Sequence, residues 1–145
     1  MNILLIQKSD TLIEAIKNVL KEFQTCKIEL KSSILSKYDK IKIEQKIKKN
    51  KPDILIIDEF YLKDQVEEVS YLLNHYPRIS SAVIISNLQD RRLIKECTKY
   101  GISNFIPKDS SHKFYNELFI FLNKEHLKRE IEKIIVDIVH LKERK

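Results

Sequence analysis

The stretch PDILIID, residues 52–58, decides the fold of this chain. Four consecutive apolar residues, Ile54 to Ile57, follow a proline and end at Asp58. A short apolar run between such boundaries is typical of a strand buried on both faces, as in a parallel sheet covered by helices. The stretch therefore predicts a central strand with a carboxylate at its carboxyl end.

Four further segments are strand-like: residues 3–6, 27–33, 81–86 and 103–108. Segments with apolar residues at helical spacing separate the strands, at residues 11–23, 39–49, 64–76 and 89–100. Strands that alternate with amphipathic helices predict an α/β fold, here a doubly wound, five-stranded parallel sheet. Thr11 with Glu14, or Asp10 alone, is the expected cap of the first helix. Gly101 stands where a left-handed helix cap is expected.

The composition indicates one globular domain, because 145 residues with 43% apolar and 33% charged side chains can build one core. No apolar run is long enough to span a bilayer, and the amino terminus opens as a strand without the layout of a secretory signal, so we expect a cytoplasmic protein. Cys26 and Cys97 form no Cys-x-x-Cys pair and are expected to be core thiols.

Several classes of function are excluded or disfavoured by the residues that the chain lacks. With a single glycine, it cannot build the glycine-rich loops that cradle phosphates or dinucleotides. The histidines are scattered and show no metal-ligand spacing. The net charge is +6, and residues 37–51 contain seven lysines. Nucleic-acid binding by this stretch is the alternative we keep, but it lacks arginine and stacking aromatics, which favours a solvated helix face.

The ends of the strands carry the candidate chemistry, because ligands of doubly wound sheets bind beyond the carboxyl ends of the strands. Strand one ends in Gln7 and Lys8, strand three in Asp58, strand four in Ser86 and Asn87, and strand five in Lys108. One carboxylate, one hydroxyl and two ammonium groups are therefore expected to converge on one rim.

This order and spacing resemble the receiver domain of two-component response regulators (CheY-like) over residues 2–123. The resemblance implies that Asp58 is the position that accepts a phosphoryl group from a histidine kinase. It further implies that Ser86 and Lys108 contact that phosphoryl group, and that Phe105 is the aromatic whose rotamer reports the switch.

The departures from the family concern the metal pocket. The family places two acidic residues just after strand one to hold Mg²⁺, and those positions here are Gln7 and Lys8. An ammonium cannot ligate a cation and repels it, so Mg²⁺ binding is expected to be weak or absent. Glu59 follows Asp58, and strand alternation predicts that it points away from the site.

Two hypotheses for the rim remain open. In the first, the chain is a pseudo-receiver in which Lys8 replaces the metal and pairs with Asp58, and phosphorylation is impaired or absent. In the second, a dedicated histidine kinase still phosphorylates Asp58. In either case the chain is expected to act through a signalling partner and not as an enzyme. The family implies a recognition face that includes Arg91, Arg92, Tyr100 and Phe105.

Residues 113–145 contain no Gly or Pro and predict a long carboxyl-terminal helix beyond the receiver-like domain. Apolar residues recur on it at the alternating spacing of four and three that coiled coils use: Leu127, Ile131, Ile134, Ile138 and Leu141. Dimerisation by this helix is the interpretation we favour. The alternatives are that the seam packs back on the domain, or that the helix is the stub of a linker to an output domain.

Overall fold

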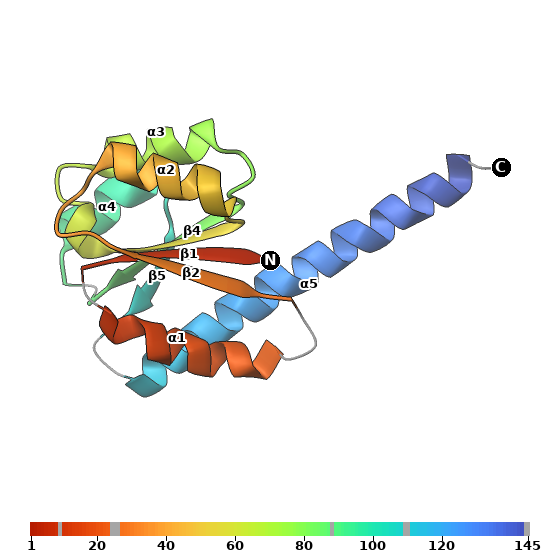
Figure 1. Cartoon of the computed structure of the whole chain (residues 1–145), viewed down its shortest axis with the longest axis horizontal. Helices are drawn as coiled ribbons and strands as arrows, with labels where there is room; N and C mark the ends of the chain where they lie inside the picture. Colours follow the sequence, from red (N-terminus) through yellow and green to blue (C-terminus); the bar gives the residue numbers. More distant parts are fainter. Residues whose placement is uncertain (9, 24–26, 88, 109–110, 144–145) are drawn as a thin grey trace.

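The computed structural model describes residues 1–8, 10–23, 27–87, 89–108 and 111–143. One sheet of five parallel strands runs in the order β2-β1-β3-β4-β5 (Figure 1). The strands are β1 (Asn2–Gln7), β2 (Glu29–Ile34), β3 (Ile54–Asp58), β4 (Ser81–Ser86) and β5 (Asn104–Pro107). The predicted doubly wound, five-stranded parallel sheet is confirmed.

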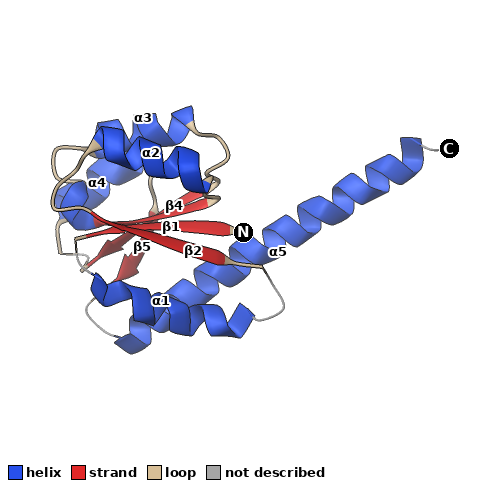
Figure 2. Ribbon diagram, viewed as in Figure 1, coloured by secondary structure: helices blue, strands red, loops and turns tan. Residues whose placement is uncertain are grey.

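In the described part of the chain, five α-helices cover the sheet: α1 (Ile13–Leu20), α2 (Lys40–Asn50), α3 (Val66–His75), α4 (Arg91–Lys99) and α5 (Ser111–Glu143). The 3₁₀ turns η1 (Asp10–Leu12) and η2 (Lys21–Phe23) extend α1 at its two ends, and η3 (Glu59–Tyr61) follows β3. Figure 2 shows α1 and α5 on one face of the sheet and α2, α3 and α4 on the other. Both faces are therefore covered, as the apolar strands require.

The central strand β3 joins the two halves of the core. Ile54 and Ile56 pack with α1 and α5, whereas Leu55 and Ile57 pack with α2, α3 and α4. All four are buried, because β3 lies between β1 and β4 and has helices above and below. The continuous apolar run of residues 54–57 is the direct signature of this position.

The helix boundaries follow local chemistry, with one departure from expectation. The N-cap of α1 is Leu12 and not Thr11 or Asp10, and the Leu12 side chain makes no capping hydrogen bond. Instead, the side-chain oxygen of Gln7 accepts a hydrogen bond from the Leu12 amide at 3.3 Å. The expected cap was wrong because a 3₁₀ turn precedes α1 and shifts its start. At the end of α4, Gly101 has a φ of +84°, which confirms the left-handed cap.

The helix α5 has two parts with different surroundings. Phe114, Leu118 and Leu122 are buried against the sheet and α1. Beyond them the helix leaves the domain (Figure 1), and its side chains are exposed from Leu127 onward, apart from a half-buried Arg129. The alternative in which the seam packs back on the domain is therefore wrong. Within the described ranges, no helix is long and apolar enough to cross a membrane.

Candidate functional site

The carboxyl ends of β3, β4 and β5 bring part of the predicted set together. Parallel pairing aligns Asp58 with Ile85, and Ser86 with Pro107, so the three strands end at the same rim. A backbone hydrogen bond from the Lys108 amide to the Ser86 carbonyl, at 3.2 Å, extends the β4–β5 pairing by one residue. The Lys108 side chain is thereby directed toward the end of β3.

Asp58 is held by two contacts through one oxygen. Its Oδ1 accepts a hydrogen bond from the Phe60 amide at 3.0 Å, which caps η3, and lies 3.2 Å from Lys108 Nζ. The Asp58 side chain is 15% exposed and that of Lys108 33% exposed. The convergence of Asp58 and Lys108, which the resemblance implied, is therefore present.

Glu59 lies in the site, contrary to expectation. Its Oε2 accepts a hydrogen bond from the buried Ser86 hydroxyl at 2.7 Å. Its Oε1 accepts one from the Asn87 amide at 3.5 Å and lies 3.7 Å from Lys108 Nζ. The alternation argument failed because the strand ends at Asp58: η3 begins at Glu59, and its backbone turns the side chain back over the rim.

Lys8 does not form the expected ion pair with Asp58. Its ammonium lies over the Phe60 ring, 4.5 Å from the ring centre, in a cation–π contact. The ion pairs that the structure gives Asp58 and Glu59 are both with Lys108. The expectation was wrong because η3 places an aromatic ring next to the end of β1, and a half-exposed ring offers Lys8 a contact that keeps its ammonium partly in water.

Gln7 and Lys8 do not fit a magnesium site. The Gln7 side chain is 1% exposed, and its carbonyl oxygen is engaged by the Leu12 amide. Its amide nitrogen, a donor, has no hydrogen-bond partner among the described residues. No group of three or more acidic, His or Cys side chains in the described part of the chain is arranged to hold a metal ion. Mg²⁺ requires several oxygen ligands, and these two residues do not supply them.

A groove of about 1040 Å³ adjoins the rim between η3 and the start of α4. Its lining includes Glu59, Phe60 and Asn87 of the rim together with Arg91 and Arg92 of α4. Two residues of the recognition face implied by the resemblance are therefore neighbours of the Asp58 rim. The other two, Tyr100 and Phe105, are half-buried and pack against the core on the same face of the sheet.

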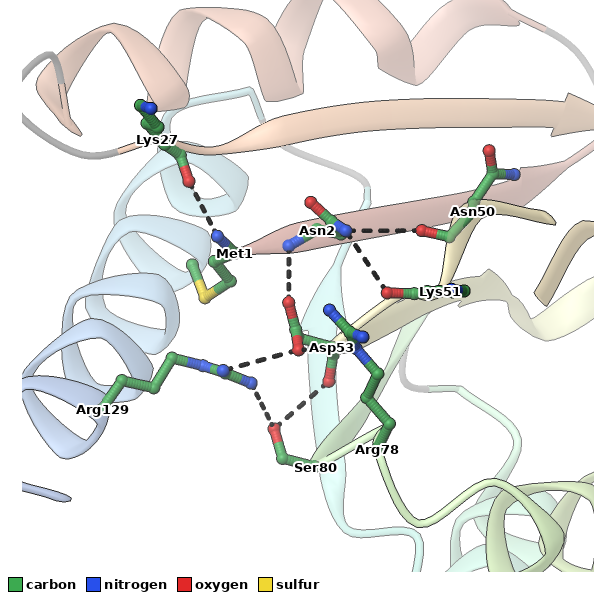
Figure 3. A network of polar contacts seen from close by, with 9 residues as sticks. All are labelled: Met1, Asn2, Lys27, Asn50, Lys51, Asp53, Arg78, Ser80 and Arg129. Carbon is green, nitrogen blue, oxygen red and sulfur yellow. Dashed lines mark hydrogen bonds and ion pairs between the residues drawn. The ribbon is translucent and has the colours of Figure 1, made fainter. Parts of the chain in front are cut away.

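A second polar cluster, which sequence analysis did not identify, lies at the amino ends of β1, β3 and β4, opposite the rim (Figure 3). Asp53, just before β3, accepts a hydrogen bond from the Asn2 amide at 2.7 Å. Its other oxygen lies 3.5 Å from both Arg78 and Arg129. Arg129 also donates to the Ser80 hydroxyl at 3.2 Å. Since Arg129 belongs to α5, this cluster ties the helix to the sheet where the helix leaves the domain.

The remaining candidates lie apart from the rim. Cys97 is fully buried, as expected for a core thiol, and Cys26 lies outside the described residues. In the lysine-rich stretch 37–51, α2 buries Ile43 and Ile47. Lys40 of this helix pairs with Glu68 at 3.8 Å. Most of its other lysines are exposed, as on a solvated helix face.

No protein-family model matches the sequence, and no curated protein matches it. Solved structures do. The non-phosphorylated receiver domain of the stress response regulator RcsB from Escherichia coli has a TM-score of 0.67 at 13% identity, over 88% of this chain and 94% of that one. A CheY-like protein, TadZ, from Pseudomonas aeruginosa has a TM-score of 0.61 at 15% identity, over 86% of this chain and 91% of that one.

The longer RcsB response regulator from Salmonella typhimurium has a TM-score of 0.64 at 14% identity. The match covers 86% of this chain and 60% of that one, so this chain spans less than two thirds of that protein's length. These likenesses show that the chain has the CheY-like receiver fold. At such identities they show the fold alone, and the role of the rim has to be argued from its own residues.

Proposed function

We propose that this chain is an atypical receiver module of two-component-type signal transduction. It acts through contacts with a signalling protein and not as an enzyme, and Mg²⁺-dependent phosphorylation of Asp58 is impaired or absent. The observation that supports this most strongly concerns the two residues at the metal-pocket positions: the Gln7 side-chain oxygen already accepts a hydrogen bond from the Leu12 amide, and Lys8 is a cation. Metal stabilisation of a transferring phosphoryl group is worth several kcal/mol, so its loss costs roughly a hundredfold or more in rate.

The test is the mass of the intact protein after incubation with Mg²⁺ and acetyl phosphate. We expect no gain of a phosphoryl group in the wild type over a time in which an ordinary receiver domain is fully modified. Gln7→Asp combined with Lys8→Asp is expected to introduce acidic ligands and raise the modification rate. Asp58→Asn in that background identifies the acceptor.

A rapid, Asp58-dependent mass gain in the wild type would show that the proposal is wrong. Modification of the wild type by a histidine kinase, but not by acetyl phosphate, would support the second hypothesis, a receiver that depends on a dedicated kinase. These outcomes distinguish a receiver that cannot be phosphorylated from one that is phosphorylated only by a dedicated histidine kinase.

We further propose that the exposed part of α5 pairs with the same helix of a second copy. The seam residues Leu127, Ile131, Ile134, Ile138 and Leu141 are each 47–61% exposed. Apolar patches of this kind mark interaction surfaces. In a parallel pair, Asp137 and Lys142 flank the seam at positions that can form ion pairs between the helices.

The expected affinity is modest. Covering a half-exposed aliphatic side chain contributes about 1 kcal/mol, so ten seam residues in two helices contribute about 10 kcal/mol. Association costs at least about 4 kcal/mol of this. The remainder, about 6 kcal/mol, corresponds to a dissociation constant of tens of micromolar. The dimer is therefore expected to dissociate on dilution.

Sedimentation equilibrium over a wide concentration range tests this pairing. We expect the wild type to be a monomer at low concentration and a dimer at high concentration. Ile131→Lys with Ile138→Lys should remain monomeric throughout, whereas Lys133→Ala, which lies off the seam on the same helix, should behave as the wild type does. A wild type that stays monomeric at the highest concentration would contradict the proposal.

A further inference from the structure

Three donors at the rim meet around one carboxylate. The Ser86 hydroxyl, the Asn87 amide and the Lys108 ammonium come from the end of β4, the residue after it and the residue after β5. All three contact Glu59, and Ser86 is 2% exposed. A hydroxyl, a backbone amide and an ammonium within reach of one oxyanion are the groups that proteins use to bind phosphate or carboxylate.

We propose that Glu59 is an internal anion of this site: its carboxylate occupies the three donors and keeps small oxyanions of the phosphate class out. The proposal concerns the regulation of the rim already described and rests on the proposed function only for its consequence in signalling. The carboxylates of Asp58 and Glu59 both contact the ammonium of Lys108. Lys8 is turned to Phe60.

The covalent link to the chain gives Glu59 its advantage. Asp58 caps η3, so the turn that carries Glu59 is fixed to the end of β3. A ligand tethered this closely competes with an effective concentration in the millimolar range or above. A free oxyanion must displace it and must also approach two carboxylates that share one ammonium. Both effects act against binding of an external anion while Glu59 is in place.

The consequence for signalling concerns the groove beside α4. Glu59 and Asn87 line this groove together with Arg91 and Arg92. When Glu59 is bound to Ser86 and Asn87, residues of the chain itself fix the shape and charge of this part of the groove. A partner that docks there would meet the same surface whether or not a phosphate donor is present.

The experiment is a titration of the whole chain with inorganic phosphate, followed by the backbone amide resonances of Asn87 and Lys108. Sodium chloride at matched ionic strength is the reference. We expect no saturable shift in the wild type and a saturable shift in Glu59→Ala, with affinity increased at least about tenfold. Glu67→Ala removes the same charge from α3 and should behave as the wild type does. Adding Ser86→Ala to Glu59→Ala should abolish the shift.

The same spectra show whether each variant is folded, because a folded chain keeps its dispersed amide resonances. Equal phosphate shifts in the wild type and Glu59→Ala would overturn the proposal. A folded Glu59→Ala that gives no shift would overturn it too. Neither result measures Mg²⁺ binding at Gln7 and Lys8 or dimerisation, so this proposal can fail while the proposed function stands.

Discussion

Replacing Asp53 by alanine tests the cluster that ties α5 to the sheet. The Asp53 side chain is 10% exposed and accepts a hydrogen bond from the Asn2 amide at 2.7 Å. A hydrogen bond to an ionised acceptor contributes about 2 kcal/mol. The ion pairs with Arg78 and Arg129, whose side chains are 57% and 33% exposed, add about 0.5 kcal/mol each because solvent screens them. The free energy of unfolding is therefore expected to fall by about 3 kcal/mol.

Urea denaturation followed by circular dichroism measures this loss, since a shift of the midpoint at constant slope reports stability alone. Asp53→Asn retains an acceptor oxygen and is expected to lose about half as much as Asp53→Ala. Combining Asp53→Ala with Arg129→Met in a double-mutant cycle isolates the pair, and the same cycle with the more exposed Arg78→Met is its matched control. We expect the coupling energy to be larger for Arg129.

Two results would refute this reasoning. A loss below about 1 kcal/mol for Asp53→Ala would mean that the hydrogen bond to Asn2 contributes little beyond solvation. A coupling energy of zero with Arg129 would mean that the ion pair between Asp53 and Arg129 does not help to hold α5 on the domain.

Three further predictions concern stability and reactivity. Leu118→Ala is expected to lower the free energy of unfolding by about 2–5 kcal/mol, because Leu118 is fully buried. Leu127→Ala is expected to change it by less than about 0.5 kcal/mol at low protein concentration, because Leu127 is exposed. Chemical denaturation of the two variants measures both changes. Burial raises the pKa of Cys97 from 9.0 to about 11. The folded state therefore favours the protonated thiol, and the resulting stability should be complete below pH 9 and lost toward pH 11, a loss absent in Cys97→Ala. Phe60→Leu removes the ring under Lys8 and is expected to lower the free energy of unfolding by about 0.5–1 kcal/mol. High salt should reduce this contribution less than it would reduce that of a surface ion pair. A double-mutant cycle of Lys8→Met and Phe60→Leu that shows no coupling energy would contradict the contact.

The sheet could be predicted from the sequence because its strands are apolar runs with clear boundaries. The strands at residues 54–57 and 81–86 can be predicted without knowledge of their neighbours, because a strand buried on both faces has a nearly continuous run of apolar residues. The placement of Asp58 beside Lys108 followed from parallel strands that end at one rim.

The details of the rim could not be predicted, because they depend on a turn of three residues. The 3₁₀ turn η3 places Glu59 over Ser86 and Phe60 beside Lys8, and strand alternation does not apply to it. The signal available in the sequence was an acidic residue directly after the strand, in a loop without proline. The Asp53 cluster was missed for another reason: its partners, Asn2, Arg78 and Arg129, are far apart in the chain.

The projecting part of α5 is a rigid arm that is attached to the domain near Arg129. From that residue to the end of the helix at Glu143 the arm is about 20 Å long at 1.5 Å per residue. No Gly or Pro interrupts it, so it can transmit rotation instead of absorbing it at a kink. A tilt of about 10° at the base would displace its tip sideways by about 3.5 Å, less than the helical pitch of about 5.4 Å. A small change in how α5 is seated on the sheet would therefore be enough to change the distance between the ends of two such helices.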